Sequence, residues 1–300
     1  MDSMFTDIMK AFKEQKKPQL DFIWPGFLAG AVGMVVAPGA TGKSFWALEA
    51  AMSVACDVPG GDLVGLKPQR AGRVVYWSSE DPAPILVQRV HAIGQYLDPA
   101  ARQAIAKNLV LKPIMGLHLN IMDDRQLSDV VTICAGARLI VLDSLSRIHR
   151  LDENSNSDMM RLIVTLEYIA THTGAAVLFL HHVSKASVRG GYIDRQQAAR
   201  GASALVDSVS WSGFMAKMTE AEALRLSDRV YGCQPIGSDR RDSFVRFGVS
   251  KQSHDDDVIP FNQWYERRNG GVLVPVELTE INGWRRVGSS RRAYLSGAQI

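Results

Sequence analysis

The stretch Val35-Val-Ala-Pro-Gly39-Ala-Thr-Gly42-Lys43-Ser44 decides how the rest of the chain is organised. Met34 to Ala37 is apolar and predicts a short buried strand, whereas Phe45 to Met52 has the composition of a helix. A strand that runs through a turn of small residues into a helix at Lys-Ser is typical of a phosphate-binding loop. Ala37 replaces the usual first glycine, and we expect its methyl group to fit because that position only turns the strand. The alternative, a chance glycine turn before a helix, explains neither flank.

Backbone N–H groups of such a loop surround phosphates, and the helix N-terminus adds partial positive charge. We expect Lys43 to reach the β- and γ-phosphates of ATP and the Ser44 hydroxyl to ligate Mg²⁺. The residues expected to bind the nucleotide are Pro38, Gly39, Ala40, Thr41, Gly42, Lys43, Ser44 and Phe45.

Composition indicates an ordinary soluble protein. The 300 residues are 46% hydrophobic and 22% charged, and the net charge of +3 is too small to indicate a nucleic-acid partner by itself. Three cysteines, far apart and without a C-x-x-C pair, argue against a zinc site or a disulfide framework. No run reaches the roughly 18 apolar residues of a membrane span, and the N-terminus lacks the apolar core of a secretion signal. We therefore expect a cytoplasmic protein with no membrane partner.

Apolar runs and helical patterns alternate after the phosphate loop. Segments 73–81, 139–143 and 175–182 each predict a buried strand, and amphipathic stretches between them predict helices. This alternation predicts an α/β fold in which helices flank a mostly parallel central sheet. Strands on either side of Asn269-Gly-Gly predict a hairpin, so we expect antiparallel edge strands at the C-terminal side.

The chain divides into three expected parts. Residues 1–24 form an N-terminal arm in which Phe5, Ile8, Met9 and Phe12 fall at helical spacing. Residues 25–282 form a single ATPase domain. Residues 283–300 form a basic tail that we expect to be disordered.

Carboxylates close two of the predicted strands. Hydrolysis of a phosphoanhydride needs a metal, an aligned water and positive charge where negative charge develops. We expect Asp143 to hold Mg²⁺ with Ser44 rather than to cap a helix. Glu80 ends a strand that we place beside the phosphate-loop strand, where it would orient and deprotonate the attacking water. Asp81 is the alternative, and either carboxylate could instead cap the helix that follows.

Two histidines, His181 and His182, end another central strand. Neighbours on a strand point in opposite directions, so one of them is expected to face the site. We favour His182 as a sensor of the γ-phosphate, although a structural histidine with a satisfied hydrogen bond is the simpler reading.

The polar segment 184–197 follows these histidines and carries Lys185, Arg189 and Arg195. Charge suits contact with a phosphate backbone, but Tyr192 is the only aromatic residue available for base stacking. Such a cluster is often plain solvated surface. Its position directly after the sensor strand favours binding of single-stranded DNA.

Several segments together resemble one family, the hexameric replicative DNA helicases of the plasmid RepA type, which belong to the RecA-like, DnaB-related P-loop ATPases. The similarity runs from about residue 20 to 280. The segments that carry it are Ala37-Pro-Gly-Ala-Thr-Gly-Lys-Ser44, Ser79-Glu-Asp-Pro82, Leu139-Ile-Val-Leu-Asp-Ser144, Phe179-Leu-His-His-Val-Ser-Lys185, Gln196-Gln-Ala-Ala-Arg-Gly-Ala-Ser203 and Val245-Arg-Phe-Gly-Val-Ser-Lys251. The resemblance implies a RecA-like core, a homo-hexameric ring and single-stranded DNA in its central hole.

The resemblance also implies site residues. It assigns Lys43 to phosphate, Glu80 to water activation, Asp143 to metal and His182 to sensing. Such rings complete each site with a cation from the next subunit. Lys251 matches the lysine that relatives place there, and Arg200 and Arg246 are the other candidates. Ser253 and Ser210 stand where relatives carry arginine.

The predicted function is therefore an ATP-hydrolysing ring helicase that unwinds duplex DNA during replication of a plasmid or other mobile element. ATP and Mg²⁺ are its expected cofactors, and a primase or an origin-binding initiator is a possible partner. The alternative is a RecA-like regulatory or recombination ATPase that binds DNA without unwinding it. A small-molecule kinase is a third class, but no acceptor pocket or lid is evident.

Overall fold

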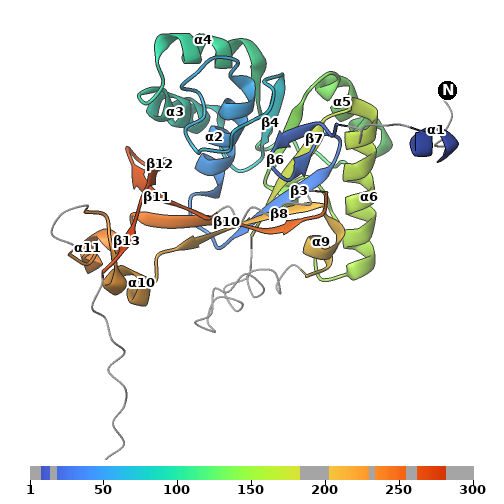
Figure 1. Cartoon of the computed structure of the whole chain (residues 1–300). Helices are drawn as coiled ribbons and strands as arrows, with labels where there is room; N and C mark the ends of the chain where they lie inside the picture. The colour runs from blue at the N-terminus through green and yellow to red at the C-terminus, as the bar shows by residue number, and fades with distance from the viewer. Residues whose placement is uncertain (1–7, 14–18, 183–202, 230–233, 255–261, 282–300) are drawn as a thin grey trace, which may run out of the picture.

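The computed structural model describes residues 8–13, 19–182, 203–229, 234–254 and 262–281. A central sheet dominates it (Figure 1). The strands of that sheet are β3 (Val32–Ala37), β4 (Val74–Ser78), β5 (Leu109–Pro113), β6 (Leu139–Asp143), β7 (Ala176–His182), β8 (Trp211–Lys217), β10 (Phe244–Gln252), β11 (Asn262–Arg268) and β12 (Val272–Val276). Two short antiparallel pairs lie outside it: β1 (Phe22–Trp24) with β2 (Phe27–Leu28), and β9 (Leu226–Ser227) with β13 (Thr279–Glu280).

The strands of the central sheet follow the order β12-β11-β10-β8-β3-β7-β6-β4-β5. From β8 to β5 every neighbouring pair is parallel, whereas β8, β10, β11 and β12 pair antiparallel. The fold predicted from the sequence, a mostly parallel sheet with antiparallel strands added at its C-terminal side, is confirmed.

One expectation about strand order is wrong. The strand that ends before Glu80, β4, is not beside the phosphate-loop strand β3, because β7 and β6 lie between them. Parallel strands are joined by crossovers over the sheet, so sequence order alone does not fix which strands become neighbours. β4 pairs instead with β6, which brings Ser78 opposite Asp143.

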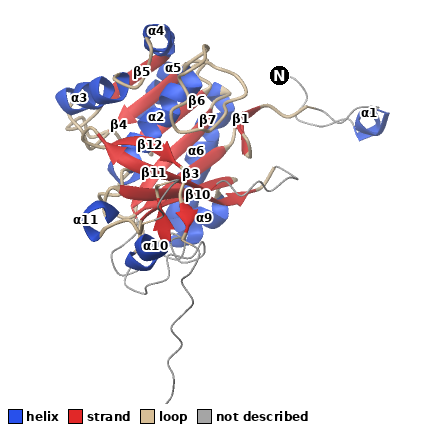
Figure 2. Cartoon of the chain, turned by 60° about the vertical axis from the view of Figure 1, so that its left-hand side comes forward, coloured by secondary structure: helices blue, strands red, loops and turns tan. Residues whose placement is uncertain are grey.

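Helices cover both faces of the parallel strands (Figure 2). The helices are α1 (Ile8–Lys13), α2 (Lys43–Ala55), α3 (Ala83–Gly94), α4 (Pro99–Asn108), α5 (Asp124–Cys134), the 3₁₀ turn η1 (Leu145–Arg147), α6 (Asn156–Thr173), α9 (Ser203–Ser208), α10 (Glu220–Arg225) and α11 (Ser238–Arg241). Buried side chains of α2, α3 and α4 share one core with one face of the sheet. Those of α5, α6 and α9 share another core with the opposite face.

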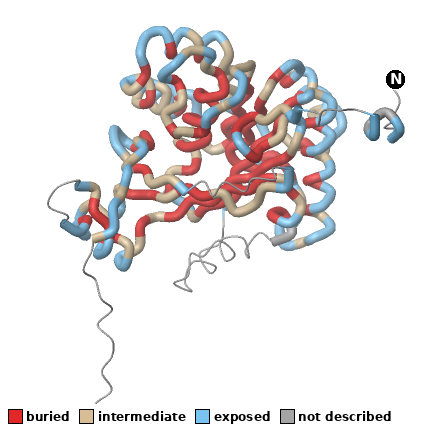
Figure 3. The backbone as a smooth tube through the Cα atoms, viewed as in Figure 1, coloured by how far each residue is buried: buried red, intermediate tan, exposed pale blue. Residues whose placement is uncertain are grey.

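Alternation along β3 explains these two layers. Val35 and Ala37 point into the first core, and Met34 and Val36 point into the second. The strand is therefore apolar throughout, as expected for a parallel strand covered on both sides. Figure 3 shows buried backbone concentrated in the central strands and exposed backbone along the outer helices.

The hairpin of β11 and β12 packs against the start of α2. Gly271, in its Asn-Gly-Gly turn, has a φ of 140°, and a side chain there would collide with the ring of Phe45. Two glycines at this turn thus allow a close approach as well as the backbone conformation. The Leu273 N–H donates to a carboxylate oxygen of the buried Glu49 at 2.9 Å, which ties β12 to α2.

No helix among the described residues is long and apolar enough to cross a membrane. The predicted basic tail and much of the N-terminal arm lie outside the described residues. Within that arm, α1 exposes Ile8, Met9 and Phe12, at 65%, 59% and 77% of their surface.

Candidate active site

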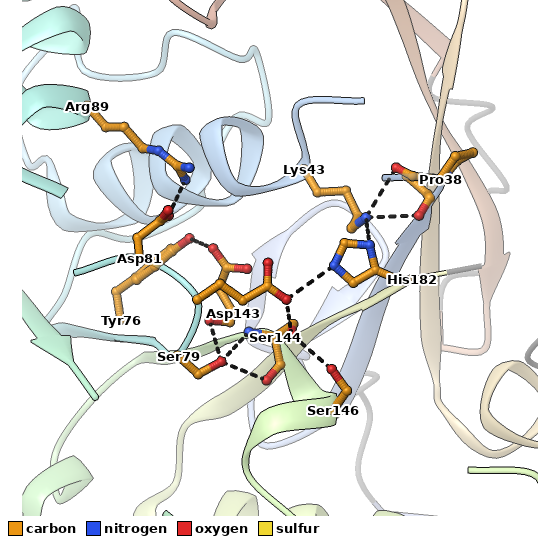
Figure 4. Close-up of polar contacts among 12 residues, drawn as sticks. Pro38, Lys43, Tyr76, Ser79, Asp81, Arg89, Asp143, Ser144, Ser146 and His182 are labelled. Carbon is orange, nitrogen blue, oxygen red and sulfur yellow. Dashed lines mark hydrogen bonds and ion pairs between the residues drawn. The ribbon is translucent and has the colours of Figure 1, made fainter. Parts of the chain in front are cut away.

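The phosphate loop connects the end of β3 to the start of α2 (Figure 4). Ala37 is buried and lies outside the left-handed backbone region, so a methyl group replaces the usual glycine without strain. Positive φ values occur instead at Ala40, with 60°, and Gly42, with 100°. Gly42 is the residue before the helix, and its conformation is one that glycine adopts readily.

Lys43 is the buried cation of this loop, with 5% of its surface exposed. Its Nζ donates to the carbonyl oxygens of Ala37 at 2.9 Å and Pro38 at 3.4 Å, and it lies 3.0 Å from His182 Nδ1. Burial lowers the pKa of Lys43 to about 8, although the carboxylates of Asp143 and Glu80 oppose that shift. The amine is thus mostly charged at neutral pH.

Asp143 ends β6 and is almost entirely buried. The Tyr76 hydroxyl donates to its Oδ2 at 2.6 Å. Burial raises the pKa of this carboxyl, while hydrogen bonds from Tyr76 and Ser44 oppose the shift. Asp143 therefore lies next to the first helical turn of the phosphate loop, where the sequence predicts a metal ligand.

Glu80 reaches the same place from β4. Its Oε1 accepts a hydrogen bond from the Ser144 hydroxyl at 2.6 Å and lies 3.3 Å from His182 Nε2. The hydrogen bond with His182 is the main cause that lowers the pKa of Glu80 to about 2; the bond from Ser144 adds to it, and partial burial opposes it. Glu80 is therefore an ionised, oriented carboxylate at neutral pH.

His182 links these groups. Because Nδ1 faces the ammonium of Lys43, it acts as the acceptor, and Nε2 carries the proton that it donates to Glu80. A neutral imidazole thus bridges the cation and the carboxylate. His181 is 7% exposed, and burial lowers its pKa to about 4. Of the two histidines, His182 is the one that faces the site.

Asp81, the alternative to Glu80, is bound elsewhere. Its carboxylate forms an ion pair with Arg89 at 2.8 Å, and the Arg89 guanidinium also lies 5.2 Å from the centre of the Phe45 ring. The geometry therefore favours Glu80 as the carboxylate available to a water.

The carboxyl ends of β3, β7, β6 and β4 thus bring Lys43, His182, Asp143 and Glu80 together. Open parallel sheets bind ligands at this edge. The sequence places all these residues at strand ends, and the structure adds the contacts between them.

Sequence reasoning missed three polar contributors. Tyr76 lies inside an apolar strand, so only its hydroxyl distinguishes it from the core residues around it. Ser144 directly follows Asp143, and adjacency to a strand-end carboxylate is a signal that could have found it. Arg267, on β11, donates to the Ala40 carbonyl at 3.3 Å, and that contact depends on a hairpin far away in sequence.

Other predicted residues lie elsewhere. Lys251 is near the end of β10, where it pairs with Ser212 at the start of β8, so it lies at the opposite edge of the sheet from Lys43. Its Nζ donates to the Asp207 carbonyl at 2.7 Å. Arg246 forms an ion pair with Glu222 at 3.2 Å. The remaining predicted residues, Arg200, Lys185, Arg189 and Arg195, lie outside the described part of the chain.

The donors near the phosphate loop fit Mg²⁺. Magnesium is usually held by one or two carboxylates, waters and the phosphates of the substrate rather than by a cage of protein ligands. The Ser44 hydroxyl and the Asp143 carboxylate supply such a partial set, and the described residues contain no denser cluster of metal ligands.

These features define a P-loop α/β ATPase core. The chain belongs to the AAA domain family, whose model matches residues 2–188, more than half of its length.

Two solved structures show similar folds. The first, the structure of an ATPase domain, aligns with a TM-score of 0.56 and 12% identity, over 84% of this chain and 87% of that chain. The second, the flagellar accessory protein FlaH from Methanocaldococcus jannaschii, aligns with a TM-score of 0.49 and 12% identity, over 84% of this chain and 91% of that one. The first of these confirms the RecA-like architecture; at this identity it is evidence for fold alone.

Proposed function

We propose that this chain is an ATP-driven helicase of the plasmid RepA type, which moves along single-stranded DNA as a homo-hexameric ring. One observation carries the proposal: His182 contacts both Lys43 and Glu80, at 3.0 and 3.3 Å. The residue best placed to feel the γ-phosphate is therefore also the last described residue before the basic segment 184–197.

The chemistry follows from the positions of these side chains. Lys43 places positive charge where the transferred phosphoryl group develops negative charge. Glu80, ionised and held by Ser144, orients a water in line for attack. Bound Mg²⁺, held by Ser44 and Asp143, would supply further charge neutralisation.

Coupling depends on the two hydrogen bonds of His182. While ATP is bound, its phosphates compete with His182 for Lys43. When the γ-phosphate leaves, that competition ends and the imidazole returns to Lys43. Because segment 184–197 follows His182 directly, we infer that this exchange moves the predicted DNA-binding residues.

A ring is supported by the residues that have no role in their own chain's site. Lys251 lies at the edge of the sheet opposite Lys43, so it can complete only the site of a neighbouring subunit. The apolar side chains that α1 exposes also suit contact with another copy of the chain. A head-to-tail contact of this kind closes into a ring if its rotation permits.

Lys43→Ala tests the proposal. We expect ATP turnover to fall by about 10²–10³-fold, as on removal of one charge-stabilising donor. Unwinding of a forked duplex should be lost, while the mass of the assembly in solution stays the same. Lys107→Ala, which changes an exposed lysine on α4, should leave both activities intact. Normal turnover in Lys43→Ala would end the proposal.

The forked duplex also separates this function from its nearest rival. A RecA-like regulatory or recombination ATPase would hydrolyse ATP in response to single-stranded DNA but displace no strand. Lack of stimulation by DNA would point away from both.

A further inference from the structure

A second pocket lies at the same edge of the sheet as the phosphate loop. Its volume is about 450 Å³, and its lining includes Ser79 after β4, Ile114 after β5 and the segment 146–150 after β6. The strands β7 and β6 separate β4 from β3, which puts the pocket about 14 Å or more from the loop at 4.8 Å per strand. One nucleotide triphosphate in the loop therefore does not account for it.

The charge of this pocket favours an anion. Arg147 and Arg150 line it with exposed side chains, and neither forms an ion pair with any residue that the structure describes. None of its lining residues, all within the described chain, carries a carboxylate, and none is Phe, Tyr or Trp. Guanidinium groups recognise phosphate oxygens well, whereas a base would need an aromatic surface on which to stack.

His149 fixes the shape of the arginine segment. The Leu151 N–H donates to its Nδ1 at 3.1 Å, and burial lowers the pKa of its imidazole. His149 is therefore a neutral, buried anchor that holds the turn on which Arg147 and Arg150 stand. The positive charge of the pocket comes from these two arginines.

A chain of hydroxyls connects the pocket to Glu80. The Ser146 hydroxyl, which lines the pocket, lies 3.2 Å from the Ser144 hydroxyl. Ser144 in turn donates to Glu80 Oε1 at 2.6 Å. The Arg147 guanidinium is also close enough to contribute to the lowered pKa of Glu80. An anion held by Arg147 would therefore change both the field at Glu80 and the hydroxyls that orient it.

We propose that this pocket binds a backbone phosphate of single-stranded DNA and transmits its occupancy to Glu80 through Ser146 and Ser144. The inference rests on the proposed function, because it requires a DNA substrate. It adds a contact point separate from segment 184–197, on the far side of Glu80 from the phosphate loop.

The first test measures binding of labelled oligo(dT) over a series of salt concentrations. The double variant Arg147→Gln/Arg150→Gln should bind about tenfold more weakly, and its salt dependence should fall by about 0.7 for each lost phosphate contact. Arg161→Gln is the matched control, because Arg161 is an exposed arginine on α6 that pairs with Asp158 away from the pocket. Thermal melting of each variant checks that it is folded.

The outcomes separate the two proposals. If wild type binds oligo(dT) and the double variant binds it equally well with the same salt slope, the pocket assignment is wrong and the helicase proposal stands. If wild type binds no oligo(dT), both fail together. Free phosphate is the other source of the same chemistry: inhibition of ATP turnover by inorganic phosphate that the double variant alone resists would overturn the DNA assignment.

The second test concerns transmission to Glu80. At saturating oligo(dT), Ser146→Ala should lose at least about half of the DNA stimulation of ATP turnover, because the hydroxyl path to Ser144 is broken. Ser128→Ala, an exposed serine on α5, should keep full stimulation. Full stimulation in Ser146→Ala would overturn the proposed connection.

Discussion

The parallel and the antiparallel parts of the sheet use their charged residues differently. In the parallel part, Lys43, His182 and Glu80 come from three separate strand ends and contact one another. In the antiparallel part, Arg246 pairs with Glu222 and Lys251 binds the carbonyl of Asp207. The first set converges, whereas the second is dispersed.

Strand direction explains the contrast. All parallel strands end at one edge, so residues from distant parts of the sequence meet there. Antiparallel strands end at alternate edges, and Lys251 therefore lies beside the start of β8. The comparison teaches that this chain assembles a hydrolytic site from its parallel strands, while the cations of its antiparallel strands are available to a neighbour.

Glu80→Gln should break the parallel part most severely. The amide keeps the shape of the side chain but cannot accept a proton, so turnover should fall by about 10²–10⁴-fold. ATP binding, measured with a fluorescent analogue, should change little because Lys43 and the loop remain.

Asp81→Asn is the comparison for that variant, because Asp81 is paired with Arg89. It should lose far less activity. A larger loss in Asp81→Asn than in Glu80→Gln would reverse the assignment of the two carboxylates.

A mixture of two inactive variants sharpens the comparison. Lys251→Ala should lower turnover by about tenfold or more if it removes a cation that stabilises the transition state of a neighbour. Mixed with Lys43→Ala chains in equal amounts, it should regain activity, because about a quarter of the interfaces in a closed ring then keep both lysines. Steady-state ATP turnover of the mixture gives the answer.

Mixing must take place before the rings form, and each variant alone serves as its own baseline. A mixture no more active than the sum of its parts would mean that Lys251 does not act across an interface.

Glu49→Gln probes the seam between the two parts and has the smallest expected effect. Burial raises the pKa of Glu49 to about 8, against a single opposing hydrogen bond from the Leu273 N–H. Between about pH 4.5 and 8 the unfolded chain binds fewer protons than the folded one, so this group's contribution to stability falls as pH rises.

The amide removes that decline. At pH 8 the variant should be more stable by on the order of 2 kcal/mol, which raises the melting temperature by several degrees, and near pH 4.5 the difference should vanish. Thermal unfolding across this range measures it. Glu167→Gln, at an exposed position on α6, should show no such trend.

Much of the parallel fold could be predicted from the sequence. Each buried strand is an apolar run closed by a polar residue, and each such residue lies at the predicted edge. What failed was the neighbour of β4. Crossover connections decide that order through the packing of whole helices on the sheet, which local periodicity does not record.

The site was only partly predictable for a similar reason. Motif spacing identified Lys43, Asp143 and Glu80, but the hydrogen bonds that set their charge come from Tyr76 and Ser144, which look like ordinary strand and turn residues. Choosing between His181 and His182, and between Glu80 and Asp81, required knowing which way each side chain points and which partner holds it.

The buried aromatic residues beside the phosphate loop have a practical use. Trp46, in the first turn of α2, stacks on Phe247 with ring centres 4.1 Å apart, and Trp24 meets its edge at 6.3 Å. A tryptophan packed two positions after Ser44 senses any rearrangement of that turn through its intrinsic emission. Nucleotide binding can therefore be followed optically in the unlabelled protein.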